Sequence, residues 1–164
     1  MNKANCKQYG ITIVEFSIIS SVVLLLIFAI LEIGMFVFNL QALNDLTRRA
    51  ARIASVCQVY DSNIYDLAVD EGKPNDFLQE NLIIDYLDID GNSVENPEPE
   101  NDHDKIKFVR VSIENYKYSF SGILDFLGDN GLVSAPFFET TLASESLGVE
   151  RIDSDGNKSY TTCK

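Results

Sequence analysis

Two adjoining stretches decide the fold of this chain: Gly10-Ile11-Thr12-Ile13-Val14-Glu15-Phe16, and the uncharged run SIISSVVLLLIFAIL over residues 17–31. Apolar residues resume after Glu32, so residues 11–38 form one long apolar segment. A hydrocarbon core about 30 Å thick needs about 20 helical residues, and this segment exceeds that length. Glu15 and Glu32 would be about 25 Å apart along the helix, near opposite edges of the core. The sequence predicts a transmembrane helix over residues 11–38.

A secretory signal peptide also combines a basic start with an apolar stretch. Its apolar region, however, runs only about 7–15 residues and ends at a cleavage site of small residues. No such site follows the run described above. A carboxylate near the head of a membrane segment is energetically unfavourable and is expected to have a partner. For Glu15 the natural partner is an amine freed by cleavage of the chain.

The residues around Gly10 form a recognisable pattern. Lys3 and Lys7 precede the glycine, and Glu15 and Phe16 follow it at the head of the apolar run. This arrangement resembles the processing site of type IV-type prepilins, in particular the Gly-x-x-x-x-Glu-aromatic form of tight-adherence (Flp) pilus subunits.

The resemblance implies cleavage between Gly10 and Ile11 by a membrane aspartyl prepilin peptidase on the cytoplasmic face. A glycine before the scissile bond leaves the backbone open to the protease. Glu15 would then neutralise the Ile11 ammonium of a neighbouring subunit inside a low-dielectric filament.

Apolar residues continue beyond the membrane segment at spacings of three and four, the period of one helix face. They are Leu43, Leu46, Ala50, Ile53 and Cys57, whereas Asn44, Arg48 and Arg52 fall on another face. A continuous helix from Ile11 to about Cys57 would be about 70 Å long. The stripe packs either on the chain's own domain or on other subunits, and its spacing fits both.

The segment after the membrane helix, residues 43–54 with Arg48, Arg49 and Arg52, resembles the post-membrane signature of TadE-like proteins. Residues 31–34, with Glu32 and Gly34, resemble the membrane exit of the same family. The match covers residues 8–58, with a weaker one at 140–149, and TadF-like proteins are close relatives. The resemblance implies a cytoplasmic amino terminus and a periplasmic domain, whereas the basic residues flanking the helix favour neither orientation.

The chain is strongly acidic. It has 13 Lys and Arg against 25 Asp and Glu, a formal charge of −12. Both basic residues of the first ten precede the helix, so residues 11–164 have 11 basic and 25 acidic side chains, a charge of −14. Such a surface repels phosphate groups, so nucleic acid is not expected as a partner, and soluble partners are expected to be neutral or basic.

The cysteines allow one disulfide. Cleavage after Gly10 would remove Cys6 and leave Cys57 and Cys163. If the residues beyond the membrane face an oxidising compartment, these two could close a loop of about a hundred residues, worth on the order of 4 kcal/mol. The alternative is two unrelated buried thiols.

Residues 59–164 alternate between apolar and polar positions in several short stretches, which indicates strands. Expected strands cover residues 82–88, a return strand from Val94, residues 105–113 extended through Tyr116, Tyr118 and Phe120, residues 137–142, and a hairpin of 148–152 with 158–162. The strand at 105–113 alternates best and is expected at the centre of the sheet. The predicted fold class is α+β and pilin-like, with a long N-terminal helix, transmembrane and then amphipathic, packed on a small antiparallel sheet.

Two segments, residues 88–92 and 153–157, share a D-x-D-G-N form that opens calcium-binding EF-hand loops. The required glutamate at the twelfth position is replaced by Pro99 and Lys164, so Asp-Gly turns are the preferred interpretation. The single histidine, His103, lies in an acidic loop and is expected to be solvated. Zinc-ligand spacing, phosphate-binding glycine loops and the G-x-S-x-G turn are all missing from the sequence. We expect no enzyme, no metal and no cofactor.

The predicted organisation is a prepilin leader at 1–10, a transmembrane helix at 11–38, its amphipathic continuation at 39–58 and an acidic periplasmic domain at 59–164. The predicted function is that of a minor pseudopilin that primes, initiates or caps a tight-adherence pilus for surface attachment. Expected partners are the prepilin peptidase, a TadF-like pseudopilin, the major Flp pilin and the assembly platform. The predicted location is the bacterial inner membrane as a single-pass protein, with incorporation into an extracellular pilus left open.

The alternative is a single-pass, membrane-anchored periplasmic binding or scaffold protein that is neither processed nor assembled. A simple tether has no use for Glu15 or for a glycine at its membrane entry, which favours the pseudopilin.

Overall fold

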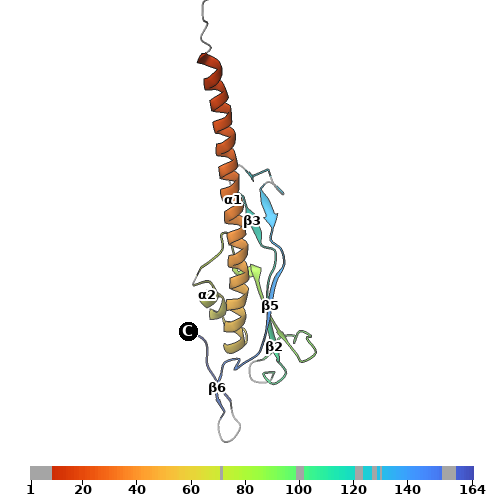
Figure 1. Cartoon of the computed structure of the whole chain (residues 1–164). Coiled ribbons are helices and arrows are strands. Elements are labelled where there is room, and N and C mark those ends of the chain that lie inside the picture. The colour runs from red at the N-terminus through yellow and green to blue at the C-terminus, as the bar shows by residue number, and fades with distance from the viewer. Residues whose placement is uncertain are drawn as a thin grey trace, which may run out of the picture. The chain divides into compact units, whose positions relative to one another are not determined.

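The computed structural model of the protein describes residues 9–70, 72–98, 102–120, 124–126, 129, 131–152 and 158–164 (Figure 1). The chain divides into two compact units. The first, which we call the anchor unit, combines Met1–Val37 with Ser119–Val133, and the second, the sheet unit, combines Phe38–Tyr118 with Ser134–Lys164.

A long helix is followed by short strands. The elements are α1 (Tyr9–Val56), α2 (Asn63–Val69), the 3-10 helix η1 (Gln79–Asn81), β1 (Leu82–Leu87), β2 (Phe108–Ile113), β3 (Lys117–Ser119), β4 (Leu132–Ser134), β5 (Phe138–Ala143), β6 (Val149–Ile152) and β7 (Lys158–Tyr160). A long apolar helix with a small antiparallel sheet confirms the predicted α+β class.

The main sheet has three strands in the order β1-β2-β5, and both pairings are antiparallel. The central position of β2 agrees with the sequence expectation. The strand begins at Phe108 rather than at residue 105, because the Lys105 and Ile106 amides donate to the Asp102 carbonyl in a turn. In the described residues, β3 also pairs with β4 and β6 with β7.

The core of the sheet unit lies between the C-terminal half of α1 and one face of this sheet (Figure 1). Helix residues Leu43, Leu46 and Ala50 are fully buried, as are Val109 and Val111 of β2, which share one face of their strand. The predicted apolar stripe is therefore buried in the chain's own domain, with Ile53 only half-buried.

Two strand expectations were wrong. The return strand expected from Val94 is only an isolated bridge between Leu87 and Ser93, next to a single hydrogen bond from the Val94 amide to the Tyr86 carbonyl. The strand expected to continue through residues 116–120 stops at Ile113. The extension fails because Asn115 adopts a φ of 56°, which turns the chain into the separate strand β3.

Tyr86 is a buried tyrosine of the sheet unit whose ionisation links stability to alkaline pH. The ring is 1% exposed, and burial is the main cause that raises the pKa of its phenol to about 12. In the unfolded chain the phenol ionises near pH 10, so between pH 10 and 12 unfolding releases a proton and rising pH favours the unfolded state.

We expect this group to lower the free energy of unfolding by about 1.4 kcal/mol per pH unit across that window. Urea unfolding of wild type and Tyr86→Phe, followed by circular dichroism at several alkaline pH values, measures the difference in slope. The same alkaline slope in both proteins would contradict the assignment to Tyr86.

Candidate functional site: helix α1 and the segments that fix its ends

The first part of α1 is apolar and uncovered. Its most apolar 18-residue window has a mean hydropathy of 2.7 and is not buried within the chain. The Ser17 hydroxyl donates to the Ile13 carbonyl at 2.9 Å and the Ser21 hydroxyl to the Ile18 carbonyl at 2.8 Å, which satisfies both polar groups within the helix. A helix with internally satisfied polar groups and an apolar surface is suited to cross a membrane.

The predicted processing site lies in the first turn of α1. The helix begins at Tyr9, so the bond between Gly10 and Ile11 is part of the helix. Residues 1–8, with Lys3, Lys7 and Cys6, lie outside the described residues.

Glu15 and Phe16 are both exposed on the second turn of α1. Within the described part of the chain, Glu15 has no hydrogen bond or ion pair. The structure therefore leaves this carboxylate available to a group from outside the described residues.

Glu32 has a partner that the sequence did not reveal. Its carboxylate accepts a hydrogen bond from the Leu124 amide at 3.0 Å, within the anchor unit. Gly34 is exposed, and an added Cβ there would meet no atom within 4 Å. The pairing of Glu32 could not be foreseen, because its donor is a backbone amide far along the chain.

The three arginines of the helix signature differ in environment. Arg48 and Arg52 are exposed one turn apart. Arg49 is 19% exposed, with its Nε 3.1 Å from an Asp45 carboxylate oxygen and its Nη2 donating to the Gly72 carbonyl at 3.5 Å. Arg48 and Arg52 are thus open to a partner, whereas Arg49 ties the helix to the loop after α2.

A disulfide joins Cys57, directly after α1, to Cys163, with the two Cα atoms 5.5 Å apart. The Cys163 amide donates to the Asp61 carboxylate at 2.7 Å, and the Asn63 side-chain amide donates to the Cys163 carbonyl at 2.7 Å. Cys163 is therefore held by a covalent bond directly after α1 and by two hydrogen bonds to residues at the start of α2.

The C-terminal end of α1 is capped by residues 144–148. The last carbonyls of a helix have no partner within it and must bond elsewhere. The amides of Glu145 and Leu147 donate to the Ser55 carbonyl, and the amide of Gly148 donates to the Val56 carbonyl at 2.6 Å. The sequence did not predict this capping role.

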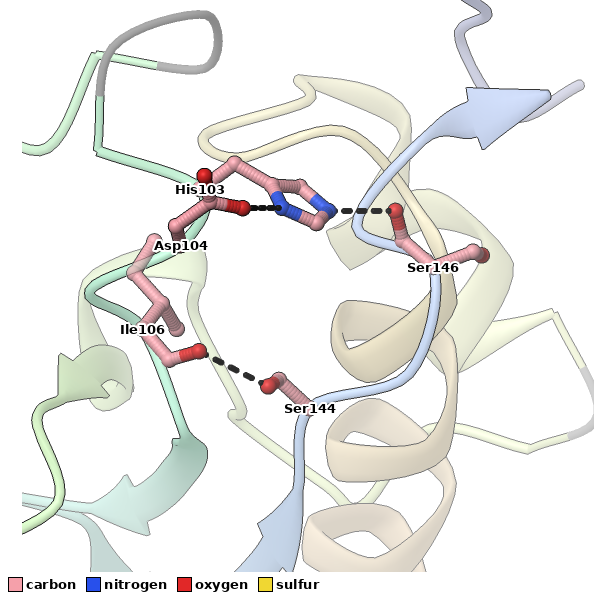
Figure 2. A network of polar contacts seen from close by, with 5 residues as sticks. All are labelled: His103, Asp104, Ile106, Ser144 and Ser146. Carbon is pink, nitrogen blue, oxygen red and sulfur yellow. Dashed lines mark hydrogen bonds and ion pairs between the residues drawn. The ribbon is translucent and has the colours of Figure 1, made fainter. Parts of the chain in front are cut away.

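The expectation that His103 is solvated was wrong. Its side chain is 20% exposed, with Nε2 3.1 Å from the Ser146 carbonyl oxygen and Nδ1 3.3 Å from an Asp104 carboxylate oxygen (Figure 2). Next to it, the Ser144 hydroxyl donates to the Ile106 carbonyl at 3.0 Å (Figure 2). The contact of His103 with Ser146 and that of Ser144 with Ile106 tie the loop before β2 to the segment that caps α1. Local sequence could not show these contacts.

The first D-x-D-G-N segment is a turn. The Asp88 carboxylate accepts hydrogen bonds from the Asp90 and Asn92 amides at 2.9 and 2.8 Å. The bond from Asn92 is the main cause that holds the pKa of Asp88 below its usual value. Residues 153–157 lie outside the described residues. Within the ranges that the structure describes, no group of three His, Cys, Asp or Glu side chains is placed to hold a metal ion.

The described residues combine a long helix, apolar in its first part, with a small antiparallel sheet packed on its second part. The fold is therefore α+β, with one helix among these residues that is long and apolar enough to cross a membrane. The protein-family model described as "TadE-like protein" matches residues 10–52, so this part of the chain is similar to that family. Comparisons with curated proteins and with solved structures gave no match. Similarity to the TadE-like family over these residues suggests involvement in the tight-adherence pilus system.

Proposed function

We propose that the protein is a minor pseudopilin, cleaved by a prepilin peptidase, that takes part in the biogenesis of a tight-adherence pilus. The observation that carries this proposal is an exposed apolar helix with an exposed carboxylate, Glu15, in its second turn. The family match supports it, because it starts at Gly10 and runs through Arg52. The proposed role is structural, with no catalysis and no cofactor.

The surface of α1 favours assembly with other helices. An apolar helix of this length is stable in lipid or against other apolar helices. Glu15 is unfavourable in lipid alone, but cleavage after Gly10 creates an ammonium group at Ile11 that can pair with it from a neighbouring subunit. We propose that other pilin-like subunits, namely a TadF-like pseudopilin and the major Flp pilin, supply this environment.

We further propose that the amino terminus is cytoplasmic and the sheet unit periplasmic. The disulfide between Cys57 and Cys163 supports this orientation, because disulfides persist in oxidising compartments such as the periplasm. The prepilin peptidase would then act at the cytoplasmic face, and the assembly platform of the inner membrane would collect the cleaved subunit.

Cleavage tests the proposal directly. In cells that contain the prepilin peptidase, we expect the membrane-bound protein to begin at Ile11, as read by amino-terminal sequencing and intact mass. Gly10→Val should block cleavage, because a β-branched side chain before the scissile bond crowds the backbone. Gly34→Val is the matched control, since it places the same side chain at an exposed glycine of the same helix and should leave cleavage intact.

A wild-type chain that still carries residues before Ile11 in the presence of the peptidase would overturn the pseudopilin proposal. The protein would then be a permanently anchored periplasmic scaffold or binding protein.

A further inference from the structure

The anchor unit contains a second segment besides α1, and it is attached where the apolar run of the helix ends. Glu32 accepts the hydrogen bond from the Leu124 amide at 3.0 Å, and the rings of Phe36 and Phe120 are 5.3 Å apart. Phe120 and Leu124 are both buried. The turn that contains Leu124 is therefore fixed beside one stretch of α1, from Glu32 to Phe36.

This attachment locates the edge of the hydrocarbon layer along the helix. Irregular backbone is not exposed to lipid inside the hydrocarbon core, because its polar groups would lack partners. The core must therefore end by Glu32. Residues 12–31 then supply the roughly 20 helical residues, about 30 Å, that the core requires.

The interfacial layer beyond the core is about 5 to 7 Å thick on each side, which corresponds to about four helical residues. Glu32 to Phe36 is a stretch of that length. The turn attached to it is thus at the depth of the lipid headgroups.

Phe126 is an exposed apolar side chain among the described residues of this turn. It is 76% exposed, two residues after the anchored Leu124. A single exposed apolar residue is ordinary on a protein surface, but a phenylalanine ring at headgroup depth can bury its apolar surface at the boundary between headgroups and acyl chains. The apolar surface of α1 continues directly into this region, because Ile33 and Met35 are also exposed.

We propose that the turn holding Phe126 is a membrane contact, in which its ring inserts among the zwitterionic headgroups of the leaflet that α1 leaves at Glu32. The headgroup class follows from charge. Residues 119–133 contain Asp125 and Asp129 and no basic residue, so anionic lipids would be repelled. The contact would fix the depth of α1 before extraction into a pilus.

Because the chain contains no tryptophan, a single substitution gives a site-specific fluorescent probe. We expect Phe126→Trp, in the full chain reconstituted into phosphatidylcholine vesicles, to have a blue-shifted emission. Lipids that carry a quencher near the headgroup should remove most of its intensity, and quenchers deep in the acyl chains should have little effect.

Ile89→Trp is the matched control, because Ile89 is also an exposed apolar residue in an acidic turn but belongs to the sheet unit. We expect its emission to stay unshifted and unquenched. Replacing phosphatidylcholine by phosphatidylglycerol should weaken the quenching of Phe126→Trp, and equal or stronger quenching would overturn the zwitterionic assignment.

Two results would overturn the membrane contact itself. One is an emission of Phe126→Trp that has the same wavelength as that of Ile89→Trp and keeps its intensity with either quencher. The other is a blue shift that disappears when the protein is diluted in lipid, which would assign the contact to a second copy of the chain.

This inference rests on α1 crossing a membrane, which is part of the proposed function, and not on cleavage after Gly10. Val22→Trp, within the exposed apolar run, tests the crossing separately. Deep quenchers should quench it. If they do and Phe126→Trp stays unquenched, only the inference fails, whereas an unquenched Val22→Trp removes the membrane anchor itself.

Discussion

Replacing both Cys57 and Cys163 by serine is expected to lower the free energy of unfolding by about 4 kcal/mol. The disulfide closes a loop with a sequence separation of 106 residues, so it removes a large amount of conformational freedom from the unfolded chain. In the chain-entropy model a loop of about 100 residues corresponds to about 4.7 kcal/mol, and native disulfides fall in the range of about 2–5 kcal/mol.

The folded chain retains other contacts at this point, so the double variant should still fold. The Asp61 carboxylate and the Asn63 side chain hold the backbone of Cys163 without help from sulfur. The loss of stability should therefore come mainly from the greater entropy of the unfolded state.

Urea unfolding of the full chain in detergent, followed by circular dichroism, measures the effect. Wild type under reducing conditions should approach the double variant, and Cys6→Ser, which removes a thiol outside this pair, should leave the midpoint unchanged. A double variant within about 1 kcal/mol of wild type would show that the disulfide does not restrict the unfolded chain as the loop-entropy model requires.

The parts of the fold that sequence predicted well are those with a strong local period. The first part of α1 is recognised by the length of its uncharged run, and the later stripe follows helical spacing, which the burial of Leu43 and Leu46 matches. In β2, Val109 and Val111 alternate onto the buried face. Such patterns depend on neighbours along the chain and need no knowledge of distant segments.

The parts that sequence missed depend on contacts between distant residues. Val94 follows an Asp-Gly turn, which predicted a return strand, but the pairing after this turn is limited to the bridge between Leu87 and Ser93 and the hydrogen bond from the Val94 amide to the Tyr86 carbonyl. His103 lies in an acidic loop, yet the Ser146 carbonyl, from a segment 43 positions later, covers it. Likewise, the donor to Glu32 is 92 positions away.

The candidate site shows the same division. The positions of Glu15, Phe16 and the arginines on α1 could be predicted from sequence because helical order places them, and their roles in assembly stay predictions. The cap at residues 144–148 could not be predicted from sequence. The need for a glycine at position 148 becomes clear only from its φ and from its contact with Gln58.

Gly148→Ala is the second change expected to have a large effect, a loss of about 3 kcal/mol in the free energy of unfolding. Gly148 has a φ of +81°, where an L side chain is strained by about 1–2 kcal/mol. An added Cβ would also lie 2.8 Å from the Cα of Gln58 and 2.9 Å from its backbone nitrogen, so backbone must move. Such overpacking adds about 1–3 kcal/mol.

Movement at this position would also disturb the cap of α1. The Gly148 amide donates to the Val56 carbonyl at 2.6 Å, so displacing the glycine weakens the hydrogen bond that satisfies the end of the helix. Two independent constraints therefore require a glycine here. One is its positive φ, and the other is its close approach to the backbone of Gln58, after α1.

Gly91→Ala separates these two constraints. Gly91 has nearly the same φ, +82°, but an added Cβ there would meet nothing within 4 Å, so only the strain of about 1 kcal/mol is expected. Urea unfolding of both variants in the full chain measures the difference. If Gly91→Ala and Gly148→Ala lose equal free energy of unfolding, the positive φ alone accounts for the glycine at position 148. The close contact with Gln58 would then contribute nothing to the stability of the cap.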